Sequence, residues 1–237
     1  MKNIKLLLFT MLGLMTMPAF SQNVLSEGSI KMEITEIDSD NEQMAAQLEM
    51  LRGTATEYFF NEEKSLVSAD MMGGMITMKS LVNNADEHLT FLFDAMGQKM
   101  MVKSTKEDRK QFEEEQNEAM EGVEIVYDES STKEVLGYKC IKATLSGEEV
   151  PLGFEMWVAP DIKASNKLIQ GMQAFELKGF PLEYVLEMDE FSMTFAATEV
   201  LKTVDAEVFK LKTDGYKEMT FEEFQTQMGS MGGGMGF

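Results

Sequence analysis

Residues 182–197 read LEYVLEMDEFSMTFAA, and this stretch decides the fold class. Large apolar side chains recur at every second position on each side of Asp189-Glu190: Leu182, Tyr184, Leu186 and Met188, then Phe191, Met193, Phe195 and Ala197. A period of two is typical of a strand with one buried and one wet face, and an acidic pair between two such runs marks a turn. The stretch therefore predicts an antiparallel hairpin.

The same alternation recurs through the rest of the chain. It is seen in residues 30–34, 76–78, 89–93, 100–102 and 154–158, and turn signals such as Gly73-Gly74 and Asn83-Asn84 separate the runs. Many short strands joined by tight turns favour an antiparallel sheet over βαβ units. We therefore predict a mainly β (α+β) protein with a curved antiparallel sheet.

Four short helices are expected beside this sheet. Asp40 or Asn41 caps the first, which ends at Gly53, and a capping box of Ser104 and Glu107 begins a polar helix over residues 105–120. Leu168, Met172 and Phe175 indicate a third helix. Thr220 and Glu223 cap a fourth, and its apolar residues can dock onto the sheet; they are Phe221, Phe224 and Met228.

The N-terminus has the pattern of a cleavable secretory signal. Lys2 and Lys5 precede a short apolar run, Pro18 breaks it, and Ala19-Phe20-Ser21 places small residues at the positions that signal peptidase reads. The prediction is a cleaved signal peptide over residues 1–21, a single β-rich domain over 24–228, and a disordered Gly/Met-rich tail over 229–237. The location is the periplasm or the medium, with no membrane-spanning segment left after cleavage.

Charge and cysteine content limit the partners. The net charge is −20, and it becomes −22 when Lys2 and Lys5 are removed with the signal. Such a charge repels nucleic acid and anionic membranes, and it favours a monomer. Cys140 is the only cysteine, so no internal disulfide forms, and its strand-like surroundings predict a buried, inert thiol with an intermolecular bridge as the minor alternative.

The common catalytic motifs are missing. His88 is the only histidine, and the chain has no G-x-S-x-G, H-E-x-x-H or G-x-G-x-x-G. Residues 38–49 resemble an EF-hand loop, but Gln43 stands where the turn needs glycine, so a strand end and a helix cap explain them better. We therefore expect no enzyme activity and no cofactor.

Methionine is unusually frequent, with 23 in the chain. Two clusters could bind a soft metal such as Cu(I) through thioethers: Met71, Met72 and Met75, and in the tail Met228, Met231 and Met235. Packing of irregular apolar space is the competing explanation and accounts for most methionines, although less well in the tail.

The apolar face of the predicted sheet is the leading candidate for a binding surface. Large, soft side chains suit acyl chains or apolar protein segments. The candidate ligand-binding residues are Phe91, Phe93, Met100, Trp157, Tyr184, Leu186, Met193 and Phe195. The alternative is a plain core filled by helices.

Three stretches in the second half carry a family resemblance: VLGYKCIKA at residues 135–143, EMWVAPDI at 155–162 and LKGFPLEYVLEM at 177–188. Their order resembles a family of exported proteins of unknown function (the DUF4412 type) and its relatives with a Gly-Leu-Pro-Gly-Leu-Ile motif. The resemblance covers roughly residues 130–225. Residues 179–184, GFPLEY, keep the first glycine and the proline of that motif but not the second glycine, so the first family is the better match.

The resemblance implies a LolA-like lipoprotein-carrier architecture, which is an incomplete antiparallel β-barrel whose concave face is covered by helices. It brings no catalytic residues, and it assigns structural roles to Pro181 and Trp157. The leading hypothesis is thus a non-enzymatic exported protein that binds a lipid, an acyl group or an apolar segment of an envelope protein. Soft-metal binding and a structural envelope module without a small ligand are the alternatives.

Overall fold

The computed structural model describes residues 24–147, 153–165, 169, 172, 175–188 and 190–230. The chain in these ranges is mainly β. The strands are β1 (Gly28–Ser39), β2 (Ala55–Phe60), β3 (Lys64–Met71), β4 (Ile76–Asn83), β5 (Leu89–Ala95), β6 (Gln98–Ser104), β7 (Glu124–Val135), β8 (Tyr138–Ser146), β9 (Gly153–Ala159), β10 (Phe180–Glu187), β11 (Phe191–Leu201) and β12 (Lys217–Met219). The helices are α1 (Glu42–Leu48), α2 (Lys106–Ala119) and α3 (Phe221–Ser230), with the 3₁₀ turns η1 (Glu49–Leu51), η2 (Met72–Gly74) and η4 (Ala206–Phe209).

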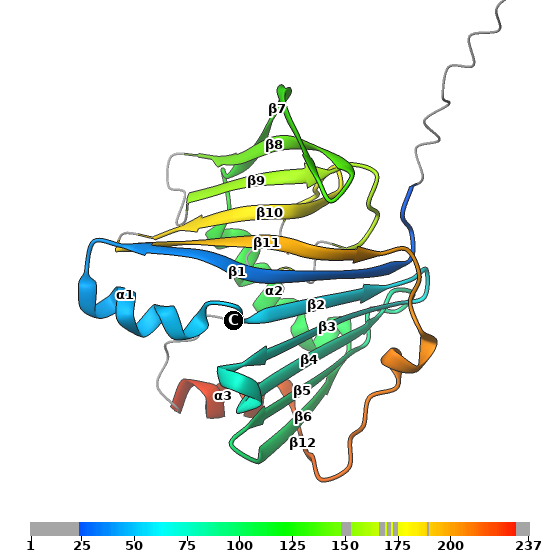
Figure 1. Ribbon diagram of the computed structural model, residues 1–237. Helices are drawn as coiled ribbons and strands as arrows, with labels where there is room; N and C mark the ends of the chain where they lie inside the picture. Colours follow the sequence, from blue (N-terminus) through cyan, green and yellow to red (C-terminus); the bar gives the residue numbers. More distant parts are fainter. Residues whose placement is uncertain are drawn as a thin grey trace, which may run out of the picture.

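All twelve strands belong to one sheet, in the order β12-β6-β5-β4-β3-β2-β1-β11-β10-β9-β8-β7 (Figure 1). Neighbouring strands are antiparallel except β12, which runs parallel to β6. β1 lies between β2 and β11 and so joins the N-terminal strands to the C-terminal ones. The hairpin predicted from residues 182–197 is β10–β11, with Tyr184 paired to Phe195 and Leu186 to Met193. The predicted fold class is confirmed.

The sheet is strongly curved, and the connection through α2 shows why it must be. Nine strands lie between β6 and β7, which would separate these two strands by about 48 Å in a flat sheet. The 14-residue helix α2 spans about 21 Å, and the five other residues between the strands bring the reach to about 38 Å at most. β6 and β7 must therefore bend toward each other, and α2 crosses behind the sheet in Figure 1.

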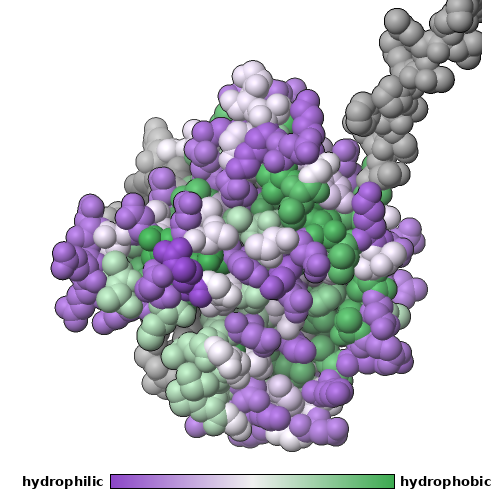
Figure 2. All heavy atoms as spheres, viewed as in Figure 1, coloured by the Kyte–Doolittle hydropathy of each residue, from purple (hydrophilic) through white to green (hydrophobic). Residues whose placement is uncertain are grey.

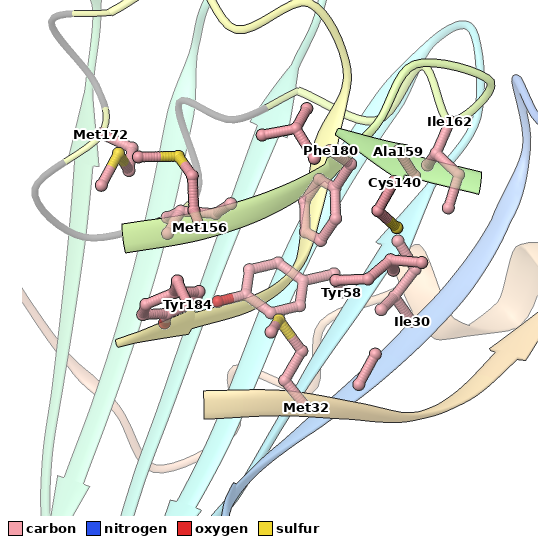
Figure 3. Close-up of a cluster of buried hydrophobic side chains, with 14 of the residues drawn as sticks. Ile30, Met32, Tyr58, Cys140, Met156, Ala159, Ile162, Met172, Phe180 and Tyr184 are labelled. Atoms are coloured by element: carbon pink, nitrogen blue, oxygen red, sulfur yellow. The ribbon is translucent and has the colours of Figure 1, made fainter. Parts of the chain in front are cut away.

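Two separate cores cover the concave face, which we call the inner face. The large core joins β1, β2 and β8–β11, and Ile30, Met156 and Phe180 in it are fully buried (Figure 3). Tyr58 of β2 meets Phe180 of β10 edge to face, with ring centroids 5.2 Å apart. Because β1 and β11 lie between their strands, these two rings meet only if the sheet is concave on this side.

The small core lies on the inner face at the other end of the sheet. It consists of buried residues from β4, β5, β6, β12 and α3, namely Ile76, Phe93, Met100, Val102, Met219 and Phe224. On the opposite, outer face, Leu66, Leu92 and Met101 are also buried, and η4 lies against β3 with its own buried Phe209. β3 is thus covered on both faces.

The helices agree with the sequence in part. Asn41 caps α1 through its side-chain oxygen, and Thr220 and Glu223 form the predicted cap of α3. The capping box of α2 is Thr105 with Asp108, one residue later than predicted, because Ser104 belongs to β6 and its hydroxyl accepts a hydrogen bond from Arg109. The helix and cap at residues 38–49 replace the EF-hand loop, since β1 continues to Ser39.

Some predicted segments lie wholly or partly outside the described ranges. These are the signal peptide over residues 1–21, Leu168 in the third helix, and Met231 and Met235 in the tail. Met172 and Phe175 are described, but neither is helical; the amide of Met172 donates to the carbonyl of Ile169 and that of Phe175 to Met172. α3 continues to Ser230 and so includes the first two residues of the predicted tail. Within the described ranges, no helix has both the length and the apolar character for a membrane span.

Candidate functional site

The inner face carries seven of the eight predicted ligand-binding residues. Phe91, Phe93 and Met100 lie on β5 and β6, where Phe91 pairs with Val102 and Phe93 with Met100. The other four lie on β10 and β11, in the pairs Tyr184–Phe195 and Leu186–Met193. Side chains two residues apart in a strand share a face, so the predicted alternation places these residues correctly.

Phe93 and Met100 are already packed in the small core. Phe224 of α3 reaches over them, with its ring centroid 6.4 Å from that of Phe93 and 5.3 Å from that of Phe91. Both contacts are edge to face, the arrangement that aromatic rings favour. Phe93 and Met100 are buried, whereas Phe91 stays half-buried. α3 therefore occupies this part of the predicted ligand site.

Tyr184 is packed in the large core. Its ring stacks on Phe195 at a centroid distance of 4.7 Å, and its hydroxyl is hydrogen-bonded to that of Tyr58 (Figure 3). Burial raises the pKa of both phenols, because no water solvates a phenolate there. Two neutral, mutually hydrogen-bonded hydroxyls satisfy each other in an apolar interior, so this pair is a structural link between β2 and β10.

An apolar group on the inner face remains partly open. Its members are half-buried and, apart from Met193, which pairs with Leu186, they pack against one of the two cores; we call them the open band: Val67, Met78, Phe91, Leu186, Met193 and Phe195. Val67 and Met78 were not among the predicted site residues. The pairing of Val67 with Tyr58 and of Met78 with Phe93 puts them on the inner face.

The helix that crosses the inner side of the sheet is polar. None of the α2 side chains that the structure describes is buried, and none belongs to either core. Phe112 holds the helix through an edge-to-face contact with Phe221 of α3, 5.7 Å between centroids. Arg109 holds it at its N-terminus, donating to the carbonyls of Ser104 and Glu87 at 3.1 and 2.8 Å.

Trp157 does not join the predicted site. Its neighbours Met156 and Val158 are fully buried on the inner face, so Trp157 points to the outer face. There it pairs with Lys142 and Glu183, and the Lys133 ammonium lies 5.1 Å from its ring centroid and 2.6 Å from the Glu183 carboxylate. Trp157 is half-buried and lies beside these charged side chains, apart from the other seven candidate residues.

Two of the surface hollows in the described part of the chain lie away from the open band. One, of about 360 Å³, is lined by Met50, Arg52, Gly53, Thr54, Ala55, Asp70, Met72, Gly73 and Gly74. The other, of about 500 Å³, is lined by Glu62, Glu63, Lys64, Asn83, Asn84 and Ala85. A ligand on the inner face would therefore contact the apolar open band and neither of these two hollows.

Ionisable groups in the described part of the chain form no metal-binding cluster. No three of its His, Cys, Asp or Glu residues are arranged to hold a metal ion. His88 is exposed and pairs with Asp86, Nδ1 to Oδ2 at 2.9 Å, as expected of a surface residue. Cys140 is fully buried, and burial raises the pKa of its thiol to about 11, so the thiol stays protonated at neutral pH.

Comparisons with known proteins leave the family open. No protein-family model matches the chain, and no curated protein matches its sequence. Matching solved structures include MucB in complex with MucA(peri), with 9% identity, 81% of this chain covered and a TM-score of 0.34. LprF from Mycobacterium bovis has 11% identity, 77% of this chain covered and a TM-score of 0.31. The match spans 56% of the MucB chain and 89% of the LprF chain. The resemblance to the exported family stays a prediction.

Proposed function

We propose that this chain is a binding protein rather than an enzyme, and that it holds the acyl chain of a lipid on the inner face of its sheet. The open band carries this proposal. Its side chains are large, apolar and half-buried, although neighbours on the same strands are packed in two cores. Apolar surface that stays partly in water costs free energy, about 25 cal/mol per Å², and an acyl chain laid along it would recover that energy.

The polar helix α2 supports the same proposal. A helix that contributed side chains to the cores could not move without exposing them. α2 contributes none among its described side chains, so a ligand that enters beneath it would break mainly the contacts of Phe112 and Arg109. We propose that α2 acts as the cover of the ligand and yields when the ligand enters.

An extracytoplasmic location is part of the proposal. The signal-like residues 1–21 support it, and burial shields the single thiol, Cys140, from oxidation there. A net charge of −20 disfavours adsorption to anionic membrane surfaces. We therefore propose a monomeric carrier that exchanges its lipid in solution.

Native mass spectrometry tests the proposal. The purified chain is incubated with palmitate and, separately, with an envelope lipid extract, and we expect a bound species at one ligand per chain. Leu186→Gln and Met193→Gln place an amide in the open band and should weaken palmitate binding about tenfold or more, since a polar group in an apolar site lacks partners.

Trp157→Phe is the matched control, because Trp157 is on the outer face, and it should bind palmitate like the wild type. A wild-type chain that stays ligand-free in both incubations would contradict the proposal. If the chain binds no lipid but carries a bound apolar peptide, the ligand is a protein segment and not an acyl chain.

A further inference from the structure

Four exposed methionines gather at one end of the sheet, and neither core explains them. Met50, Met72, Met75 and Met96 are 66%, 38%, 51% and 79% exposed. We call these four the methionine patch. Most methionines of the described chain are at least half-buried, as expected of a flexible apolar side chain that fills irregular space. Packing does not explain the methionine patch, because its side chains stay exposed to water in the folded chain.

The topology brings the four residues together from three connections. Met50 lies in η1 after α1, Met72 and Met75 lie in and just after η2 between β3 and β4, and Met96 lies in the turn between β5 and β6. The Met96 amide donates to the Met75 carbonyl at 3.0 Å, which fixes the last two connections side by side. Met50 and Met72 line the same hollow of about 360 Å³. Figure 2 shows the patch region as a pale green area over the turn between β3 and β4.

The surroundings of the patch leave the sulfur atoms accessible. Three glycines line the hollow, Gly53, Gly73 and Gly74, and a Cβ added to any of them would meet nothing within 4 Å. Met72 itself adopts a left-handed backbone, φ +52°, which is rare for a residue with a side chain. This backbone conformation raises the conformational energy of a non-glycine residue, and a functional role for the Met72 side chain would explain why methionine is found there.

Charge around the hollow favours a cation. The carboxylate of Asp70 lines it. The only basic side chain of the lining, Arg52, is already neutralised by Glu49 (Nη2 to Oε2 at 3.1 Å) and also donates to the Thr35 carbonyl. The chain as a whole carries a net charge of −20, which raises the local concentration of cations.

We propose that the methionine patch is a Cu(I) site, with the thioether sulfurs of Met50, Met72, Met75 and Met96 as its ligands. Thioethers are soft, neutral donors that favour Cu(I) over hard divalent cations. Clustered thioethers on flexible side chains allow the low coordination numbers of this ion without rearrangement of the backbone. The site is separate from the open band, so it stands or falls independently of lipid binding.

Competition with a chromophoric Cu(I) chelator under anaerobic conditions tests the site on the full chain. We expect the wild type to withdraw one equivalent of Cu(I), and Met50→Leu/Met72→Leu and Met75→Leu/Met96→Leu each to weaken binding by at least about tenfold. Leucine keeps the volume of methionine, so the fold is retained, which circular dichroism verifies. X-ray absorption at the copper edge should report sulfur neighbours only.

Two control variants separate this site from other methionines. Met188→Leu removes another exposed methionine, 44% exposed at the end of β10, and should bind Cu(I) like the wild type. Met228→Leu/Met231→Leu/Met235→Leu removes the methionines of the C-terminal cluster and should do the same. The proposal is overturned if the wild type binds no better than the four-methionine variant, Met50→Leu/Met72→Leu/Met75→Leu/Met96→Leu, or if the C-terminal variant alone carries the loss. If the four-methionine variant keeps the Cu(I) affinity of the wild type but no longer binds a protein partner that the wild type binds, the patch is a protein contact instead.

Discussion

The two buried phenols of Tyr58 and Tyr184 show how one polar contact can link distant strands. Their side chains come from β2 and β10 and share a hydrogen bond inside the large core. Tyr58→Phe leaves the Tyr184 hydroxyl buried without its partner, which should lower the free energy of unfolding by about 1–3 kcal/mol. The double variant Tyr58→Phe/Tyr184→Phe removes both hydroxyls and should cost less than the sum of the single changes. Urea denaturation of the four proteins gives the coupling, and strict additivity would contradict the hydrogen bond.

The same pair makes a prediction about alkaline pH. Burial raises both pKa values above the ordinary value of 10.0, so the folded chain keeps both protons where the unfolded chain begins to lose them. The stability that these groups contribute is complete below pH 10 and is lost as the pH rises above it. We expect the urea midpoint of the wild type to fall between pH 9.5 and 11, roughly, and the fall to be shallower in the double phenylalanine variant. Equal slopes would show that other groups control the alkaline transition.

Gly179 precedes β10 where two backbones approach closely. A Cβ at this position would lie 2.1 Å from the Ala159 carbonyl oxygen, so Gly179→Ala must shift a buried strand end. We expect a loss of more than about 3 kcal/mol in the free energy of unfolding, or failure to fold. Gly137→Ala is the matched comparison, because its φ of +83° is strained but its surroundings are open, and it should cost only about 1 kcal/mol. Thermal denaturation ranks the two variants, and equal losses would contradict the close approach.

Among the elements, α2 and α3 differ in what holds them. Phe224 of α3 is buried in the small core, so Phe224→Ala should cost about 3–5 kcal/mol. Phe112 of α2 is half-buried and contacts chiefly Phe221, so Phe112→Ala should cost only about 1–2 kcal/mol. Chemical denaturation measures both. If α2 covers a ligand, Phe112→Ala should also speed the binding of a fluorescent fatty acid in stopped-flow experiments, whereas a large loss of stability in this variant would show that α2 is part of the core.

Strands with one wet face were predictable from the sequence, and strands covered on both faces were not. In β10 and β11 apolar residues recur at every second position, and the pairs Tyr184–Phe195 and Leu186–Met193 share the inner face. β3 shows no such period, because Ser65, Leu66, Ser68 and Ala69 are all buried. η4 packs against the outer side of the strand, and its other side belongs to the covered inner face. A period of two identifies a strand only where the two faces differ.

The candidate site shows the same limit. Alternation placed Leu186, Met193 and Phe195 on the inner face, but it could not show that α3 fills the space over Phe93. Trp157 was grouped with the inner-face candidates, but its strand position puts it on the outer face beside Lys133 and Glu183. Met50 belongs to the methionine patch only because the chain turns after α1 and brings it to the same hollow as Met72. No local sequence pattern predicts that proximity.

For the whole molecule, an open sheet of twelve strands must protect its two edges. β7 is a long edge strand, and a register shift between Asp128 and Thr132 interrupts it. Asp128 accepts hydrogen bonds from Ser130 and Ser131 there, which lowers the pKa of its carboxyl to about 2 and keeps it charged. β12 at the other edge has only three residues. Bulges, charges and short edge strands all discourage pairing with another chain, which agrees with the expected monomer.

The division into two cores predicts that the sheet does not open as one unit. The large core contains several fully buried residues, including Ile30, Met156 and Phe180, and it spans both sequence halves through β1. The small core buries fewer side chains and depends on α3 for its cover. Regions with less buried apolar surface open at lower free energy, so amides of β4–β6 should exchange with solvent before those of β1, β10 and β11.

Native-state hydrogen exchange with mass spectrometric detection, at increasing denaturant below the unfolding midpoint, measures this order. Phe224→Ala should accelerate exchange in β4–β6 and leave β10 and β11 nearly unchanged, because its ring packs in the small core against Phe91 and Phe93. Met156→Ala in the large core should accelerate both regions, since loss of the central strands removes the neighbours on which β3 and β4 depend. A single exchange free energy shared by all strands would mean that hydrogen bonding along the sheet couples the two cores more strongly than side-chain packing separates them.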